Sequence, residues 1–275
     1  MSPSRLALVV SFFLGAHPLV APQTETQSPP PATSAQGAAV LQKALAALAP
    51  STPITDITLS GTARRIAGSD DETGTVVIKA LAGTGSRMDL TLPSGPRSEI
   101  RNLSAVNDPT GSWSGPDGVS HAISYHNLLT DAGWSPAFTI ASLLSVPNAV
   151  ITYIGSETKN GQSVIHVSAS QTFPTFSADP TTAKLMQHLT QTDIFLDPST
   201  SLPVSIAFAT HADGNALLDI PIEIDFSSYQ TVSGSPIPFH IQRFMNNSLS
   251  LDLQFESATL NSGLSSSTFL VGGAQ

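Results

Sequence analysis

The sequence contains no cysteine, and only 11% of its 275 residues are charged. The absence of cysteine excludes disulfides, iron–sulfur centres, thiolate zinc sites and cysteine nucleophiles, as well as an acylated cysteine anchor. Basic residues are also scarce, with 11 Lys and Arg against 20 Asp and Glu and a net charge of −9. A chain of this charge offers no extended phosphate-neutralising surface, so nucleic acid is not an expected partner.

The first 21 residues have the pattern of an export signal. Arg5 precedes an uncharged apolar stretch from Leu6 to Ala16, and small residues follow it. This stretch is too short to span a bilayer, which takes about 20 apolar residues. We therefore predict a signal peptide over residues 1–21, cleaved after Ala16 or Ala21, and no transmembrane span in the mature protein. The protein is expected to be exported to the periplasm or the extracellular space.

A Pro-rich segment separates this signal from the rest of the chain. Residues 22–37 are rich in Pro, Thr, Ser and Gln and contain no large apolar side chain. They cannot bury enough apolar surface to offset the entropy of ordering, so a disordered linker is predicted. From residue 38 onward the apolar periodicity continues without a further linker or an internal repeat. Residues 38–275 are therefore expected to form a single domain.

The pattern of this domain indicates many strands and a few short helices. Helical spacing and capping residues predict helices over 38–48, 127–133, 135–145 and 180–189. Alternating or apolar runs bounded by Gly, Pro, Asn or Asp predict strands over 54–67, 73–82, 86–92, 97–104, 110–114, 149–157, 162–171, 191–197, 202–210, 216–227, 236–246 and 248–260. Hairpin turns are expected at residues 159–161, 197–200, 213–215 and 246–247.

The C-terminal strands show which architecture to expect. Over residues 218–226 and 249–256 apolar and polar side chains alternate, so each strand has one apolar and one polar face. A flat sheet of about ten such strands would leave its apolar face uncovered, because the helices are few and short. The sequence therefore predicts a mainly β fold: a curved antiparallel sheet, an open or half barrel. The helices near 38–48, 126–145 and 180–189 are expected to cover its concave face.

Two sets of polar residues are candidates for chemistry. Asp219, Glu223 and Asp225 share a strand face, and the last two would lie roughly 7 Å apart, which suits a glycoside hydrolase acid–base pair. A solvated strand face in an acidic chain would carry the same residues. His121, His126 and Asp131 offer zinc-ligand atoms, but a spacing of five favours neither one strand face nor one helix face. We therefore predict no catalytic residue, no metal site and no cofactor.

Aromatic residues concentrate in the middle third of the chain, where the helices are expected to cover the sheet. Such side chains either line the mouth of an apolar cavity or fill the core beneath the helices. The cavity candidates are Trp113, Tyr125, Trp134, Phe138, Tyr153, Phe173 and Phe176.

The order of elements resembles that of the periplasmic lipoprotein-carrier superfamily, the LolA/LolB-like fold. The segments 115–121 (GPDGVSH), 125–134 (YHNLLTDAGW) and 238–243 (PFHIQR) are similar to those of uncharacterised secreted bacterial proteins of that fold. Carriers of this superfamily hold lipoprotein acyl chains in the hollow of the half barrel. The resemblance therefore implies a lipid or lipoprotein acyl chain as ligand, and no residue role is transferred.

These observations lead to one function hypothesis and two alternatives. The first is an exported, non-enzymatic binding protein for a lipid or another apolar ligand in the cell envelope. The second is an envelope scaffold or protein-interaction module without a ligand, tethered by the Pro-rich segment. The third is a secreted hydrolase that uses Glu223 and Asp225 or a serine.

Overall fold

The structure is a computed structural model that describes residues 34–50, 52–104, 108–173, 175 and 179–271. These residues belong to one compact unit, Ala32–Gln275. The predicted signal peptide, residues 22–33 of the predicted linker, and Phe176 lie outside the described residues. None of the helices in the described ranges has both the length and the apolar character needed to cross a membrane.

The described elements are mostly strands. The helices are α1 (Ala35–Leu48), α2 (Pro136–Ser145) and α3 (Pro180–Leu189), with the short 3-10 helices η1 (Tyr125–Leu128) and η3 (Ser266–Phe269). The strands are β1 (Asp56–Ala67), β2 (Asp70–Leu81), β3 (Gly85–Leu92), β4 (Gly95–Asn102), β5 (Thr110–Ser114), β6 (Ser120–Ala122), β7 (Ala149–Lys159), β8 (Gln162–Gln171), β9 (Thr192–Leu196), β10 (Pro203–Ala212), β11 (Asn215–Val232), β12 (Ser235–Met245) and β13 (Ser248–Leu260).

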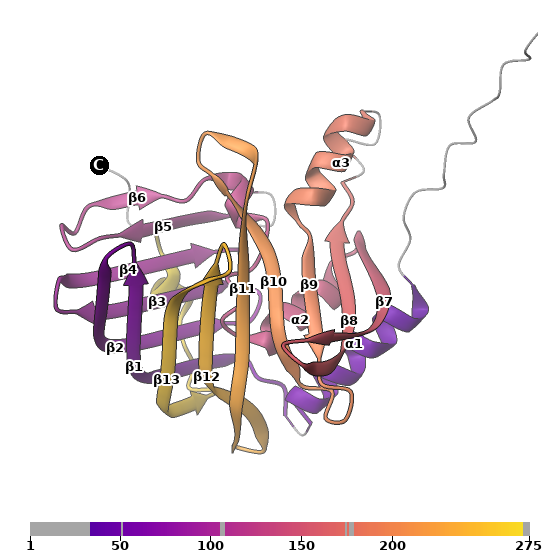
Figure 1. Cartoon of the computed structure of the whole chain (residues 1–275), viewed down its shortest axis with the longest axis horizontal. Coiled ribbons are helices and arrows are strands. Elements are labelled where there is room, and N and C mark those ends of the chain that lie inside the picture. The colour runs from indigo at the N-terminus through magenta and orange to yellow at the C-terminus, as the bar shows by residue number, and fades with distance from the viewer. Residues whose placement is uncertain (1–33, 51, 105–107, 174, 176–178, 272–275) are drawn as a thin grey trace, which may run out of the picture. The chain divides into compact units, whose positions relative to one another are not determined.

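All thirteen described strands form one sheet in the order β6-β5-β4-β3-β2-β1-β13-β12-β11-β10-β9-β8-β7. Every neighbouring pair is antiparallel, and β1 pairs with the last strand, β13. The strand direction differs strongly between β2–β4 and β9–β11 in Figure 1, as expected for a twisted and curved sheet. The edge strands β6 and β7 do not pair with each other, so the sheet stays open and the predicted fold class is confirmed.

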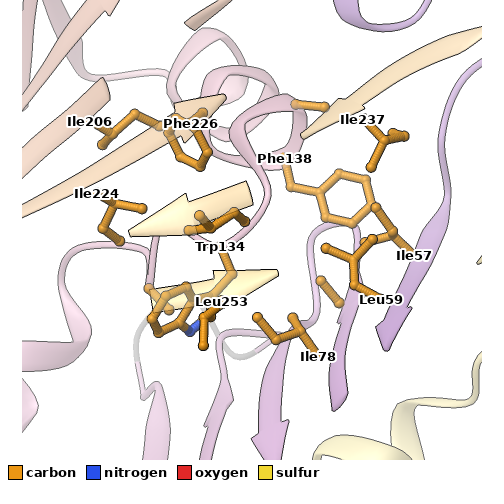
Figure 2. Close-up of a cluster of buried hydrophobic side chains, with 14 of the residues drawn as sticks. Ile57, Leu59, Ile78, Trp134, Phe138, Ile206, Ile224, Phe226, Ile237 and Leu253 are labelled. Atoms are coloured by element: carbon orange, nitrogen blue, oxygen red, sulfur yellow. The ribbon is translucent and has the colours of Figure 1, made fainter. Parts of the chain in front are cut away.

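The core lies on the concave face. Alternate residues of β1, β2, β10, β11 and β13 are buried there, and Ile206, Ile224 and Leu253 are fully covered. Figure 2 shows their side chains converging on Trp134 and Phe138, which come from the segment around α2. The cluster therefore joins the sheet to the helices.

Two helices cover this face. Leu41, Ala44 and Leu48 of α1 are buried in the core cluster, as are Phe138 and Ile140 of α2. Figure 1 shows the two helices at the β7–β9 end of the sheet, and they contact each other. Helix α1 starts at Ala35, three residues before the predicted start, because Ser34 caps it: its Oγ accepts from Gly37 N (2.9 Å) and from Tyr153 N of β7 (3.2 Å).

The third helix does not cover the concave face as predicted. Helix α3 contacts Ser170 of β8 through Gln187 and Asp219 of β11 through His188. Both partners alternate with core residues, so their side chains point to the convex side. Only Leu189 of this helix is buried, because its sequence of Thr, Lys, Gln and His provides no broad apolar face to insert into the core.

Three further details differ from the predictions. Residues 127–133 form no α-helix, since the chain makes the 3-10 turn η1 at Tyr125–Leu128 and Gly133 adopts a φ of +75°. Strand β6 was missed because it has only three residues. Strand β11 continues to Val232, where Ser233 and Gly234 form a tight turn with positive φ angles. The predicted turns at 159–161 and 246–247 are present, with Asn160, Asn246 and Asn247 at positive φ.

Candidate functional site

The concave face changes character along its strands. Near Ile57 and Leu59, at the start of β1, it is apolar and packed against the helices. Toward the end of β1 it contains a cavity of about 430 Å³, which we call the arginine pocket. Its lining combines residues of both halves of the sheet: Arg65 of β1, Met88 and Leu90 of β3, Arg97, Glu99 and Arg101 of β4, Trp113 of β5, Thr210 and His211 of β10, Arg243 and Met245 of β12, and Leu251 of β13.

The pocket gathers positive charge in a chain that is acidic overall. Arg65, Arg97, Arg101 and Arg243 line it, four of the chain's 11 basic residues. On β4, Arg97 pairs with Leu90 of β3, and Arg101 pairs with Ser86. Paired residues of neighbouring strands point to the same face of the sheet, and both β3 residues are buried on the core face. The side chains of Arg97 and Arg101 therefore face the cavity. Glu99 lies between them on the same face. The sheet therefore brings together positive charges that are up to 178 positions apart in the sequence.

Two glutamates neutralise part of this charge. Glu99 Oε1 lies 2.8 Å from Arg101 Nε, and Glu72 Oε2 lies 3.8 Å from Arg65 Nη1 and 3.9 Å from Arg97 Nη2. Burial disfavours the charged form of Glu99, but Arg101 and Arg243 outweigh it and hold its pKa below the ordinary value. Asp213 also lines the pocket, so the four arginines and the three carboxylates of Glu72, Glu99 and Asp213 leave a net charge of +1.

Two of the arginines are held firmly by the surrounding chain. Arg101 Nη1 donates to the backbone oxygens of Asn127 (2.8 Å) and Thr130 (3.3 Å). Arg243 Nε donates to Ser250 Oγ (3.1 Å), and its guanidinium carbon lies 5.7 Å from the centre of the Trp134 ring. Burial lowers the pKa of Arg243, with Glu99 acting in the opposite direction. An arginine nevertheless stays protonated because its intrinsic pKa is very high.

The other two arginines have unused hydrogen-bond donors. Arg65 Nη1 and Arg97 Nε are buried and have no hydrogen-bond partner among the described residues. Burying such a donor without an acceptor costs about 1–3 kcal/mol, and more for a charged group. A ligand oxygen in the pocket would remove this cost and form charge-assisted hydrogen bonds.

Apolar side chains complete the pocket. Met88, Leu90 and Leu251 are buried in its wall, whereas Trp113 and Met245 remain 45% and 37% exposed. The pocket therefore offers guanidinium groups beside an apolar surface, the combination that suits an amphiphile with an anionic group.

The seven aromatic candidates do not share one cavity. Trp113 lines the arginine pocket, while Tyr125 and Phe173 line a separate depression of about 400 Å³ beside η1 and α2. Trp134 and Phe138 are buried in the core, and Phe138 also borders an apolar groove of about 400 Å³ between α1 and α2. Tyr153 is partly buried against the core beside the start of α1, and Phe176 is not described.

The polar candidates are also distributed differently. His121 stacks on Trp113 at 4.3 Å between ring centres, and Asp131 accepts hydrogen bonds from Gly133 and Thr139. His126 lies beside His211 instead of forming a ligand group with His121 and Asp131. The pKa of Asp225 is raised to about 7, mainly by burial and then by the neighbouring Glu223. Glu223 Oε1 is paired with Lys159 Nζ at 2.9 Å.

The arginines were not identified as site residues from the sequence. One signal was available, since Arg97, Glu99 and Arg101 alternate within the predicted strand 97–104 and must share a face. Arg65 and Arg243 had no such signal, because their positions in the pocket depend on the pairing of β1 with β13 and of β13 with β12.

Comparison with solved structures identifies the fold. A putative outer membrane lipoprotein-sorting protein domain from Vibrio parahaemolyticus matches with a TM-score of 0.55 and 15% identity, over 85% of this chain and 96% of the other. The chain has a LolA/LolB-like fold. A DUF1329 family protein from Desulfovibrio piger also matches, with a TM-score of 0.51 and 10% identity, over 87% of this chain and 98% of the other. No protein-family model matches the sequence, and no curated protein matches it.

Proposed function

We propose that the protein is an exported, non-enzymatic binding protein for an amphiphile, a lipid or a lipoprotein acyl chain, whose anionic group enters the arginine pocket. The observation that carries this proposal is the pair of buried donors, Arg65 Nη1 and Arg97 Nε, beside the apolar wall formed by Met88 and Leu90. A neutral apolar ligand would leave these donors without acceptors, whereas a carboxylate or phosphate oxygen would satisfy them.

Electrostatics and size support the same ligand. The net charge of +1 at the pocket contrasts with the −9 of the whole chain, so an anion is attracted to this part of the concave face. A volume of about 430 Å³ lies within the 300–1,000 Å³ range typical of small-molecule sites. Among the predicted cavity residues, we propose that Trp113 contacts the apolar part of the ligand, because its ring borders the pocket and is partly exposed.

The fold supports this proposal in a more general way. One of the similar structures is a putative outer membrane lipoprotein-sorting protein domain, which supports testing a lipid-modified molecule as a ligand. In our proposal the envelope location follows from the predicted signal peptide over residues 1–21. N-terminal sequencing of the protein recovered from the cell envelope should give a first residue of His17 or Pro22, matching the two candidate cleavage sites.

A pair of matched probes tests the anionic group. The delipidated protein is titrated with a fluorescent polyene fatty acid and with its uncharged methyl ester, which share the same hydrocarbon chain. We expect the acid to bind at least about tenfold more tightly, because a hydrogen bond to a charged group contributes about 1.5–3 kcal/mol. Arg97→Gln should abolish most of this preference while leaving the binding of the ester unchanged.

The neighbouring arginine provides the control. Arg64 precedes Arg65 on β1, is exposed, and pairs with Asp71 instead of facing the pocket. Arg64→Gln should therefore change the affinity for neither probe. Equal binding of acid and ester to the unaltered protein would refute the role of the arginines, and an absence of binding by both would refute the proposed function.

A further inference from the structure

Two histidines and an aspartate meet where β10 is followed by β11. His188 lies near the end of α3, His211 at the end of β10, and Asp219 on β11. Asp219 Oδ1 is 2.9 Å from His188 Nε2 and 3.2 Å from His211 Nε2, and the three ligand atoms all lie within 4.8 Å of one another. Figure 1 shows α3 at the end of the sheet where β10 turns into β11.

The central histidine is buried without a hydrogen bond. His211 is 3% exposed, and neither of its ring nitrogens has a hydrogen-bond partner among the described residues, although Nε2 faces the carboxylate. Buried polar groups in proteins are nearly always hydrogen-bonded, so an orphaned imidazole pointing into a cluster of donors and acceptors requires an explanation. His126 Nε2, on the ring 5.8 Å from that of His211, is also buried without a partner.

The atoms have the chemistry and spacing of a metal site. Two imidazole nitrogens and one carboxylate oxygen form a common ligand set for Zn²⁺, with bond lengths of about 2.0–2.2 Å. In a tetrahedral site of this size neighbouring ligand atoms lie about 3.3 Å apart. The two separations from Asp219, 2.9 and 3.2 Å, are close to that value, and all three ligand atoms lie within 4.8 Å of one another.

We propose that His188, His211 and Asp219 bind a divalent transition-metal ion of the zinc type, with the fourth position open to water. The ligands come from three different elements, so the ion would connect α3 to β10 and β11. This connection matters for α3 because only Leu189 of that helix is buried. His188 and Asp219 lie outside the lining of the arginine pocket, whereas His211 also borders that pocket.

Metal titration tests the proposal directly. The full chain is treated with a chelator, dialysed, and titrated with Zn²⁺ by calorimetry and with Co²⁺ by visible absorption spectroscopy. We expect one ion per chain and the intense visible absorption of tetrahedral Co²⁺. His188→Ala should weaken Zn²⁺ binding by at least about tenfold, since even the loss of an outer-shell partner weakens metal sites 10–100-fold.

The choice of variants keeps the result interpretable. His188 is exposed, so its replacement leaves the packed interior unchanged, whereas replacing the buried His211 could also disturb the fold. His240→Ala is the matched control. His240 Nε2 also contacts an aspartate, Asp252 (2.7 Å), but among the described residues it belongs to no group of three metal-ligating side chains. Zn²⁺ binding that is absent from the unaltered chain, or weakened equally by His240→Ala and His188→Ala, would overturn the proposal.

A second measurement tests the connection to α3. Lys184 is exposed and is the single Lys or Arg of this helix, so trypsin cleavage after it reports on local opening. Added Zn²⁺ should slow this cleavage at least about tenfold in the unaltered protein and leave it unchanged in His188→Ala. An equal effect of Zn²⁺ on both proteins would show that the ion acts elsewhere.

Discussion

The carboxyl group of Asp225 leads to a quantitative prediction about stability. Its side chain lies on the β11 face opposite Ile224 and Phe226, between Ser205 of β10 and Gln242 of β12. Burial and the adjacent Glu223 raise its pKa from 3.8 to about 7, while Lys159, 2.9 Å from Glu223, partly opposes the shift. Asp225 Oδ1 has no hydrogen-bond partner among the described residues.

The sign of the effect follows from proton linkage. Between pH 3.8 and about 7 the folded protein keeps the proton on Asp225 while the unfolded chain has lost it. The contribution of this group to stability is therefore complete below pH 3.8 and is lost as the pH rises to about 7. The full shift corresponds to about 4 kcal/mol. Because the side chain is only partly buried, solvent screening reduces the expected loss to about 2 kcal/mol.

Asp225→Asn removes this titration and keeps a neutral side chain of the same shape. We expect the variant to unfold with a free energy about 2 kcal/mol higher than the unaltered protein at pH 8, and nearly the same at pH 4. Urea unfolding followed by the fluorescence of the buried Trp134 measures both values. A stability difference that does not change between these two pH values would refute the reasoning.

A double-mutant cycle separates the two causes of the shift. If the charge of Glu223 contributes, the effect of Asp225→Asn at pH 8 should be smaller in a Glu223→Gln background. The same effect in both backgrounds would assign the whole shift to burial.

Three further substitutions test the packing around the pocket and the core. Gly133→Ala should lower the free energy of unfolding by about 1–3 kcal/mol, because Gly133 has a φ of +75° and an added Cβ would lie 2.8 Å from Ile224 Cδ1; an unchanged thermal midpoint would contradict this. Asn127→Ala should lower the free energy of unfolding by about 2–4 kcal/mol and speed amide exchange at His211. The Asn127 side chain donates to His211 O (2.8 Å) and accepts from His211 N (2.8 Å), and the variant loses both hydrogen bonds. An unchanged exchange rate would contradict this role of Asn127. Ile241→Ala should cost about 2–5 kcal/mol in urea unfolding, because Ile241 is fully buried; a loss below 1 kcal/mol would indicate a loosely packed core.

The strand predictions succeeded where the signal is local. The alternation over residues 218–226 and 249–256 depends only on which side of a strand each residue faces. The first segment lies in β11 and the second in β13, as predicted. The helix predicted over 127–133 failed for a tertiary reason. The Asn127 side chain bonds the backbone of β10 at His211 and fixes a 3-10 turn there, and no local pattern shows this contact.

The candidate site was less accessible to sequence reasoning than the fold. The aromatic residues were correctly placed near the helices in the cases of Trp134 and Phe138, but the sequence could not distinguish core residues from pocket residues. That distinction depends on how far each side chain lies from the helices along the concave face. The arginines lie at the far end of this face, where neither α1 nor α2 fills the space.

By itself, the sequence determined the class of the protein: an acidic, cysteine-free chain whose alternating strands require one covered face. These properties are local or compositional, so they can be read without knowing which segments meet. Only the tertiary structure decided what the strands bring together. The pairing of β13 with β1 and with β12 places Arg65 and Arg243 on either side of Leu251, and the position of α3 brings His188 to His211 and Asp219. Contacts between residues so far apart in the chain depend on strand order and sheet curvature, which no local pattern encodes.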